Sequence, residues 1–454
     1  MFKKIEIWIL YLVLLLSILS AIAFGILVRQ ELVGSSKLGW VSKTALTLAE
    51  LPVIIKQLMS NDNIVSSPGE HFDVLRKGFN GEGSDREMYL LLSRFDGDIN
   101  EGVIELIDLR DFKVLHVWNP DIDKFNSSIN DDDFKYLNRD KNDSRSGLMH
   151  PLLLDNGEIM FHFETPLRKI DYCSNLVFQV SKDKFHHSIE ADSQGNIWAS
   201  SRLYPQSLPE SQVGRLIDEE GGFKDDSIVQ LSPDGEILFE KSVAQIFIDN
   251  GLESKIFSVG YATFDIDPIH LNDIQPVNSD SKFWKKGDLF LSIRNQSMIA
   301  LYRPATNKII WTGTGKFFYQ HDVNILNDHK ISLFNNNAKN FRKGLLVDGF
   351  NEMLIYDFED GVYTSYLHES MIKNKVKTPT QGRGKILENG DMFIEETDSG
   401  RTLYFNSDGT LRWTHLNRSD DGKIYRVVWS RILDSENDIN NARKVARTKN
   451  TCAS

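Results

Sequence analysis

From about residue 85 onward, the chain alternates short runs of β-branched, aromatic and leucine residues with turns rich in Asp, Asn and Gly. Asn-Gly and Asp-Gly suit the two-residue turn of a β-hairpin, because both central residues of that turn need a positive φ angle. The segments that show this hairpin pattern are residues 152–161, 189–198, 228–239, 301–311, 386–394 and 403–413. Long amphipathic helical patterns are scarce here, so the pattern predicts an all-β domain.

The hairpins belong to a longer repeated unit, in which a polar residue opens an inner strand and a tryptophan ends the outer strand. Trp118, Trp311 and Trp413 take this last place. The repeated units begin near Arg86, His150, His187, His270, His321 and Gln381. Their spacing is irregular, and the interval from 187 to 270 requires an insertion. Six such units predict a six-bladed β-propeller, with the inner strand of each blade on the central axis.

The end of the repeat region is predicted to close the ring. Residues 423–433 form a further β-type run that suits a closing strand, and closure removes sheet edges that an antiparallel fold otherwise has to protect. A juxtamembrane helical segment is expected before the repeats, over residues 29–60, in which the run 44–51 ends at Pro52 and the run 53–58 follows. We therefore divide the chain into residues 1–30, a transmembrane anchor or signal peptide; 31–84, a juxtamembrane helical stalk and linker; 85–433, the propeller; and 434–454, a polar tail.

The N-terminus carries a different pattern, an uncharged and mostly apolar run of 22 residues from Ile7 to Val28. A helix of this length spans about 33 Å, enough to cross a bilayer core. The alternative is a cleaved signal peptide with Ala21 and Ala23 at the cleavage site. Because the apolar run continues past that site, an uncleaved anchor is favoured. The propeller is then expected on the periplasmic or another extracytoplasmic side of the membrane.

Composition narrows the class of protein further. Hydrophobic residues make up 41% of the chain and aromatic residues 11%, enough for a substantial core. The net charge is −12 and no basic stripe stands out, which argues against a nucleic-acid partner. The chain has two cysteines, Cys173 and Cys452, which lie far apart in the sequence. No disulfide framework and no zinc-ligand cysteine spacing is therefore expected, and a homo-oligomer is left open.

Polar residues recur at the same points of the repeated units. His187, His270 and His321 open inner strands, and Arg294 lies in an otherwise apolar strand. Asn272 follows His270 by two residues, so in a strand both side chains are expected to face the same way. A guanidinium binds two oxygens, a neutral imidazole attacks or moves a proton, and an amide adds a donor. Converged on one axis, this set suits a tetrahedral oxyanion.

Simpler interpretations stand beside this one. A lone histidine at a strand start is more often a hydrogen-bonded turn residue, and His150 and His162 are assigned to that class. Arg294 could pair with an acid between blades, and three histidines match the ligand number of a zinc site. The remaining histidines considered, His116, His329, His368 and His415, are assigned to the surface or to packing between blades. Because the polar residues recur at the same points of the repeated units, a functional role is favoured over these alternatives.

Four motifs in order resemble the bacterial aryl-sulfate sulfotransferase (arylsulfotransferase) family. They are residues 187–198, residues 270–294, Gln320-His321-Asp322 and residues 381–391, and the similarity runs roughly from residue 85 to 432. The resemblance implies a six-bladed propeller with its active site on the axis. It also implies transfer of a sulfuryl group from a phenolic sulfate ester to a phenolic acceptor through a sulfohistidine, with no nucleotide donor and no cofactor or metal.

The resemblance also implies roles for individual residues. His321 is the expected nucleophile. The residues expected to hold the sulfuryl oxygens and to help protonate the leaving phenolate are His187, His270, Asn272 and Arg294. His186 is an alternative to His187, which is preferred because its place before Ser-Ile matches that of His321 before Asp-Val. Gln320, beside the nucleophile, is a further expected substrate contact.

Two other functions are kept as alternatives to the sulfotransferase. The first is a non-catalytic propeller that binds a protein or an anionic ligand at its top face, which would tolerate the loss of His321. The second is a metal-dependent hydrolase that uses the three histidines as ligands, which a chelator would silence.

Overall fold

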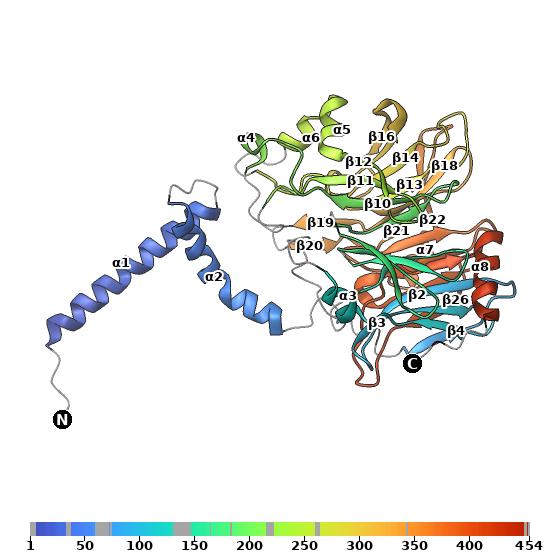
Figure 1. Ribbon diagram of the computed structural model, residues 1–454, viewed down its shortest axis with the longest axis horizontal. Coiled ribbons are helices and arrows are strands. Elements are labelled where there is room, and N and C mark those ends of the chain that lie inside the picture. The colour runs from blue at the N-terminus through green and yellow to red at the C-terminus, as the bar shows by residue number, and fades with distance from the viewer. Residues whose placement is uncertain are drawn as a thin grey trace. The chain divides into compact units, whose positions relative to one another are not determined.

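The computed structural model describes residues 6–32, 38–59, 72, 75–129, 147–163, 165–181, 184–214, 222–258, 264–341, 344–448 and 452. The chain divides into two units, Met1–Asn63 and Ile64–Ser454. The first contains helices α1 (Ile7–Leu32) and α2 (Trp40–Met59), and the described strands belong to the second (Figure 1). Residues 1–5, before the apolar run, and most of the expected linker lie outside the described residues.

Helix α1 is the one helix in the described part of the chain that is long and apolar enough to cross a membrane, over Ile7–Gln30. This agrees with the predicted apolar span. Helix α2 lies within the expected helical segment and joins its two runs, because it continues through Pro52 to Met59. Proline removes one backbone donor from a helix, but the helix-forming Ala, Leu and Glu residues before it continue the turn.

Six antiparallel sheets of four or five strands make up most of the second unit and confirm the six-bladed β-propeller. Given from the axis outward, blade 1 is β27 (Arg431–Leu433), β2 (Tyr89–Asp96), β3 (Glu101–Asp108) and β4 (Lys113–Trp118); blade 2 is β5 (Met149–Leu153), β6 (Ile159–His162), β7 (Leu167–Ile170) and β8 (Leu176–Val180); blade 3 is β9 (Ile189–Ala191), β10 (Ile197–Arg202), β11 (Asp226–Leu231) and β12 (Ile237–Ser242). Blade 4 is β13 (Leu271–Pro276), β14 (Leu289–Ile293), β15 (Met298–Arg303) and β16 (Lys308–Thr314); blade 5 is β17 (His321–Ile325), β18 (Lys330–Asn335), β21 (Glu352–Asp357) and β22 (Val362–Tyr366); blade 6 is β23 (Arg383–Ile386), β24 (Met392–Glu396), β25 (Arg401–Phe405) and β26 (Leu411–Leu416), with β1 (Gly78–Gly81) on its outer edge.

Shorter elements decorate the blades. They are α3 (Ile122–Ser127), α4 (Glu210–Val213), α5 (Val243–Asp249), α6 (Ser254–Phe257), α7 (His368–Lys373) and the hairpin β19 (Ala338–Phe341)–β20 (Gly344–Val347). Helices α4, α5 and α6 lie between the start of blade 3 and the start of blade 4, where the spacing of the repeats required an insertion. The three tryptophans lie on the outer strands β4, β16 and β26, as the repeated pattern predicts.

Both ends of the repeat region close the ring. The predicted closing segment supplies β27, and its Ile432 pairs with Leu90 of β2. Strand β1 comes from residues expected to be linker and pairs antiparallel with β26. The reason is apolar packing, since Phe79 of β1 stacks on Phe112 with ring centroids 4.4 Å apart and meets Trp413 edge-on at 5.4 Å.

A ring of hydrogen bonds joins each blade to the next around the axis. In each case, a polar side chain of one blade bonds to the backbone at the start of the next blade's inner strand. The pairs are Ser93 Oγ to Leu148 O, Ile189 N to His150 Nδ1 (3.1 Å), Leu271 N to Asp226 Oδ2 (2.8 Å), Val323 N to Asp273 Oδ2 (2.7 Å), Gly384 N to Asp322 Oδ2 (2.8 Å), and Trp429 N and Ser430 N to Glu395 (2.6 and 2.7 Å). We call this set the axial hydrogen-bond ring. It satisfies buried backbone groups that the strand ladders do not.

The C-terminal residues expected to form a polar tail instead pack on the propeller. Helix α8 (Glu436–Arg447) is capped by Ser435, whose Oγ accepts from Asp438 N at 3.2 Å. Its Ala442 and Val445 are buried in the core shared by blades 1 and 2.

The two cysteines form a disulfide, so the prediction of no disulfide was wrong. Cys173, in the β7–β8 turn, bonds to Cys452, with the two Cα atoms 5.4 Å apart. That distance is ordinary for a disulfide. Their separation of 279 residues misled the prediction, because the ring and α8 return the end of the chain to blade 2.

Replacing Cys452 with serine should lower the free energy of unfolding by about 2–4 kcal/mol, because the bond restricts the unfolded chain. Urea unfolding followed by tryptophan fluorescence measures this. In reducing buffer the variant and the natural chain should be equally stable, which serves as the control. Two free thiols in protein isolated without reductant would contradict the pairing.

Candidate active site

A cavity of about 500 Å³ lies on the propeller axis at the starts of the inner strands. All six blades contribute to it. Its lining residues are Met149, Phe163, Lys184, His186, His187, Arg202, Lys224, His270, Arg294, His321, Thr380, Gln381 and Arg426. Among the described residues no carboxylate lines this cavity, so its wall is basic, aromatic and imidazole-rich.

At the starts of the inner strands the backbone adopts positive φ angles. Side chains there do not alternate between the two faces of the sheet as they do along a regular strand. His187, His270 and Gln381 have φ angles of 62°, 52° and 52°, in the left-handed region. In blade 5 the same bend falls on Asp322 (φ 52°), beside a register shift between His321 and Val323. Non-glycine residues rarely adopt these angles, and β-bulges redirect side chains beside active sites. The repeated bend thus turns polar side chains into the cavity.

Histidines from three blades converge in the cavity. The ring of His187 lies 5.1 Å from that of His270 and 5.9 Å from that of His321. His186 also lines the cavity, with its ring 5.1 Å from His187 and 6.3 Å from His270. The Nδ1 atoms of His186 and His187 are 2.8 Å apart, so one donates to the other. Of His186 and His187, His187 is the one whose ring lies near His321. Both histidines line the cavity and remain candidates for contact with substrate.

The hydrogen bonds of His321 determine which of its nitrogens carries the proton. Its Nδ1 lies 2.6 Å from Asn336 Oδ1 and 3.1 Å from Tyr319 O. The amide of Asn336 can point only one way, because its Nδ2 donates to Thr378 O and Gln381 O at 3.0 and 2.7 Å. Nδ1 therefore faces two acceptors and carries the hydrogen. The lone pair of His321 is left on Nε2.

Burial keeps the imidazoles of His321 and His187 uncharged. It lowers the pKa of His321 well below the ordinary value, and the neighbouring Arg294 charge lowers it further. Burial likewise lowers the pKa of His187 well below that value, followed by the charge of the surrounding histidines. A neutral imidazole is the nucleophilic form of histidine.

His270 differs from the other two because it has a carboxylate partner. Its Nδ1 donates to Asp267 Oδ2 at 2.8 Å, which leaves Nε2 as the atom that gains or loses a proton. Burial lowers the pKa of His270, while the charge of Asp267 opposes this effect. Burial raises the pKa of Asp267, but the charge of His270 and the hydrogen bond between them hold it below its usual range.

Arg294 lies where the sequence pattern did not place it. Strand β14 ends at Ile293, and Arg294 begins a 3₁₀ turn whose first N–H donates to His270 O at 3.1 Å. The guanidinium lies over the ring of Tyr319 at 4.9 Å and donates to Asn295 Oδ1 at 3.1 Å. Within the described ranges, no carboxylate forms an ion pair with it, so the alternative of an ion pair between blades is not seen. Its charge is directed to the cavity.

Asn272 and Gln320 do not reach the cavity surface. Both are fully buried, and Asn272 Nδ2 donates to Gln320 O at 2.8 Å. Gln320 Nε2 donates to Met298 O at 3.0 Å and to Ser292 Oγ at 3.2 Å. The prediction that Asn272 and His270 face the same way was wrong, because the backbone bend at His270 and the register shift after Leu271 break the alternation. The two amides brace the segment that leads into His321.

His150 and His162 have structural hydrogen bonds, as assigned. His150 belongs to the axial hydrogen-bond ring, and His162 Nε2 lies 3.0 Å from His187 O. Sequence reasoning missed Asn336, Asp267 and the four basic residues Lys184, Arg202, Lys224 and Arg426. A signal existed only for Asn336, which belongs to a run of three asparagines directly after an apolar strand.

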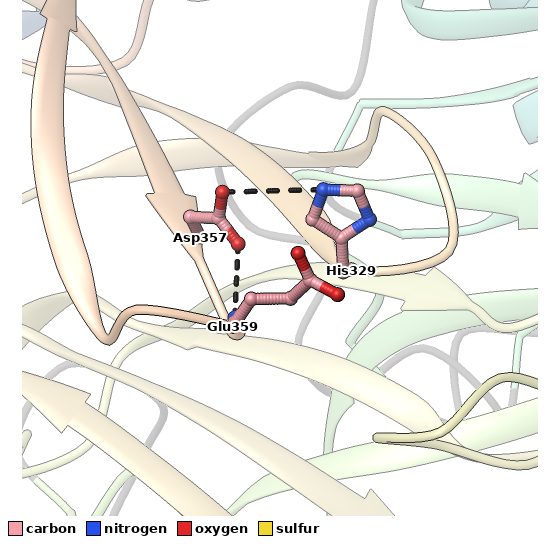
Figure 2. A group of neighbouring side chains, drawn as sticks. All are labelled: His329, Asp357 and Glu359. Carbon is pink, nitrogen blue, oxygen red and sulfur yellow. Dashed lines mark hydrogen bonds and ion pairs between the residues drawn. The ribbon is translucent and has the colours of Figure 1, made fainter.

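One group in the described part of the chain has the spacing of metal ligands, and it lies at two hairpin turns of blade 5 (Figure 2). The ligand atoms of His329, Asp357 and Glu359 lie within 4.8 Å of one another. Asp357 Oδ2 also meets Lys330 Nζ at 3.2 Å, and His329 Nδ1 lies 2.7 Å from Asp328. These partners explain the group as a surface ion-pair network. The axial histidines do not form such a group.

Fold and cavity together define a class, a β-propeller with neutral histidines and an arginine converging on its axis. A family model described as Arylsulfotransferase (ASST) matches residues 150–418. That range is more than half of the chain and contains every histidine of the cavity. The chain belongs to the arylsulfotransferase family.

Comparison with solved structures finds more distant similarity. A protein of unknown function from Bacteroides caccae is 10% identical over 73% of this chain and 94% of its own, with a TM-score of 0.44. The Pan2 WD40 domain of Neurospora crassa is 9% identical over 81% and 92%, with a TM-score of 0.40. A streptogramin B lyase is 11% identical over 78% and 96%, with a TM-score of 0.38. Similarity this low carries no argument about function. No curated protein matches the sequence significantly.

The buried neutral histidines should make the propeller less stable in acid. The histidines whose pKa is lowered well below the ordinary value are His150, His186, His187 and His321. Below about pH 6.5 the unfolded chain binds protons that the folded chain excludes, so stability is full above that pH and falls as the pH drops. Each such histidine contributes a slope of about 1.4 kcal/mol per pH unit. Urea unfolding at pH 7.5, 6.5 and 5.5 measures the slope.

The matched variant for this test is His187→Gln, which keeps a neutral polar group of similar reach. The slope should decrease by the share of one histidine, and Asn340→Gln, at an exposed side chain that does not titrate, should leave it unchanged. An unchanged slope in His187→Gln would mean that His187 is protonated in the folded chain.

Proposed function

We propose that the chain transfers a sulfuryl group from a phenolic sulfate ester to a phenolic acceptor through a sulfohistidine at His321, without a nucleotide donor. The observation that carries the proposal is the position of His321 on the cavity wall together with its protonation state. It is a neutral imidazole on the cavity wall, with its Nδ1 proton held by Asn336 and its lone pair on Nε2. Family membership supports the same class of reaction.

In the first step His321 Nε2 attacks the sulfur of the donor. The N–S bond forms as the ester S–O bond breaks, and the aryloxide leaves with the electron pair. Protonated His270 gives its Nε2 proton to the aryloxide, and Asp267 stabilises the charge that His270 carries before this transfer. Arg294 binds the sulfuryl oxygens, and its charge lies at a buried site where fixed donors stabilise a transition state strongly.

In the second step a phenol takes the place of the first product. Its oxygen attacks the sulfur, the N–S bond breaks, and the electron pair returns to His321 Nε2. Neutral His270 accepts the phenol proton, which restores the state needed for the next donor. The hydrogen on His321 Nδ1 stays on that atom throughout and is donated to Asn336 Oδ1, so the histidine ends the cycle as a neutral imidazole.

The apolar side of the cavity suits the aryl group. Met149 and Phe163, both of blade 2, line it, and Met149 packs in one cluster with Val428 and Trp429. An aromatic ring placed there removes apolar surface from water, while the sulfuryl group remains among the histidines.

We further propose that α1 anchors the chain in a membrane with the propeller on the extracytoplasmic side. The disulfide between Cys173 and Cys452 supports this side, because disulfides persist in oxidising compartments and are rare in the cytosol.

Replacing His321 with alanine should abolish transfer, because no other imidazole on the wall has its Nδ1 held by a neutral amide in the same way. The measurement is release of nitrophenolate from 4-nitrophenyl sulfate by the purified chain, with and without phenol. The natural chain should require phenol for sustained turnover. Digestion after incubation with donor alone should give a peptide that contains His321 and carries one sulfuryl group.

The other outcomes separate the alternatives. Turnover that survives in a folded His321→Ala variant would contradict the mechanism. No turnover by the natural chain with several aryl sulfates would favour the binding propeller. Loss of turnover with chelator would make the histidines metal ligands.

Asn336 is proposed to act through His321 as a positioning residue. Asn336→Leu removes the acceptor for Nδ1–H and should lower kcat by about 10–100-fold. Asn336→Asp should instead raise the pKa of His321, because a carboxylate would face Nδ1, and should move the acidic limb of the pH–rate profile to higher pH. The control is Asn340→Asp at an exposed position on β19, which should change neither kcat nor the pH–rate profile. An unshifted profile in a folded Asn336→Asp variant would contradict this role.

A further inference from the structure

One wall of the cavity is basic. Lys184, Arg202 and Lys224 line it, and all three belong to blade 3 or its insertion. Lys184 and Arg202 are held together by their backbones, which exchange N–H to O bonds of 3.3 and 2.9 Å. Lys224 is placed by its own N–H, which donates to Ile266 O at 2.7 Å. We call this group the basic wall.

Within the basic wall, Lys224 is the residue best able to bind a ligand. Arg202 is buried and its Nε donates to Asp226 Oδ1 at 3.1 Å. The ammonium of Lys224 lies 3.8 Å from Asp267 Oδ2, beyond hydrogen-bond length, and its side chain is 26% exposed. That same oxygen already accepts from His270. Lys224 therefore has N–H donors left for an anion.

The basic wall is separate from the place where the sulfuryl group is proposed to bind. Arg294 and His321 come from blades 4 and 5, whereas Lys224 precedes β11 of blade 3. His186 and His270 also line the cavity, where His186 Nε2 is 3.2 Å from Asp226 and the His270 ring is 6.3 Å from that of His186. A second anionic group would let one substrate contact both sets of cations. The cavity of about 500 Å³ has room for an aromatic ring that connects them.

We propose that the phenolic substrates of this chain carry a second anionic group, a carboxylate or a second sulfate on the aryl part, and that Lys224 binds it. Arg202 and Lys184 add to the positive field. The inference rests on the proposed function, which places the sulfuryl group beside Arg294 and His321. An aryl sulfate whose ring carries no further charge would leave Lys224 with Asp267 alone, at 3.8 Å, and no carboxylate of the described residues lines the cavity itself.

Binding of aryl sulfonates tests the proposal without any transfer, because a sulfonate has no ester bond to break. The probes are 4-sulfobenzoate, a dianion, and benzenesulfonate, a monoanion of the same ring, titrated into the natural chain by calorimetry. The dianion should bind about tenfold more tightly, the effect of one hydrogen bond between charged groups. Lys224→Gln should remove this preference. Arg294→Gln should weaken both probes.

The matched control is Lys316→Gln, which changes an exposed lysine outside the cavity lining and should keep the preference. Equal affinity of the two probes for the natural chain, or a preference that survives in Lys224→Gln, would overturn the proposal. The outcome is independent of the proposed function, because a preference lost in Lys224→Gln supports the second anion site even if no aryl sulfate is turned over. Turnover through His321 with no preference for the dianion would leave the function standing and overturn this site alone.

Discussion

The axial hydrogen-bond ring is the constraint on which the rest of the structure depends. Each inner strand begins with a backbone bend, and the bend leaves a buried N–H or carbonyl that its own sheet cannot pair. A side chain from the preceding blade supplies the partner, so no blade can form its axial edge alone. The same contacts hold the site, since Asp322 follows His321 and Asp226 binds the N–H directly after His270. Closing the ring and assembling the cavity are therefore one event.

The ring also sets the charge of the cavity. The acids nearest the axis, Asp226, Asp273, Asp322 and Glu395, all accept backbone N–H groups. None of these four acids lines the cavity, whose surface consists of cationic, imidazole, apolar and neutral polar side chains. Burial then keeps the imidazoles neutral, which gives a nucleophile but makes the fold sensitive to acid. The anion-binding character and the pH dependence share this cause.

Much of the architecture could be predicted from the sequence. The hairpin turns and the repeated pattern of apolar and polar residues predicted six blades, and the tryptophans predicted the outer strands. The histidines that recur in repeat register do converge on the axis. The errors have physical reasons: positive φ at His270 turned Asn272 away from the cavity, and Arg294 lies in a turn after its strand instead of within it. Asn336 was missed because its role depends on which atoms face its amide, and spacing along the chain cannot show that.

The sequence by itself determined what depends on short-range chemistry: the apolar span of α1, the hairpins, the number of blades and the residue types that reach the axis. These follow from periodicity and from the φ preferences of a few residues, which neighbours along the chain decide. Only the tertiary structure decided the tautomer of His321, the disulfide, the basic wall and the use of residues 78–81 as a sixth-blade strand. Each of these joins groups from different blades or chain ends, and their distances exist only once the ring has closed.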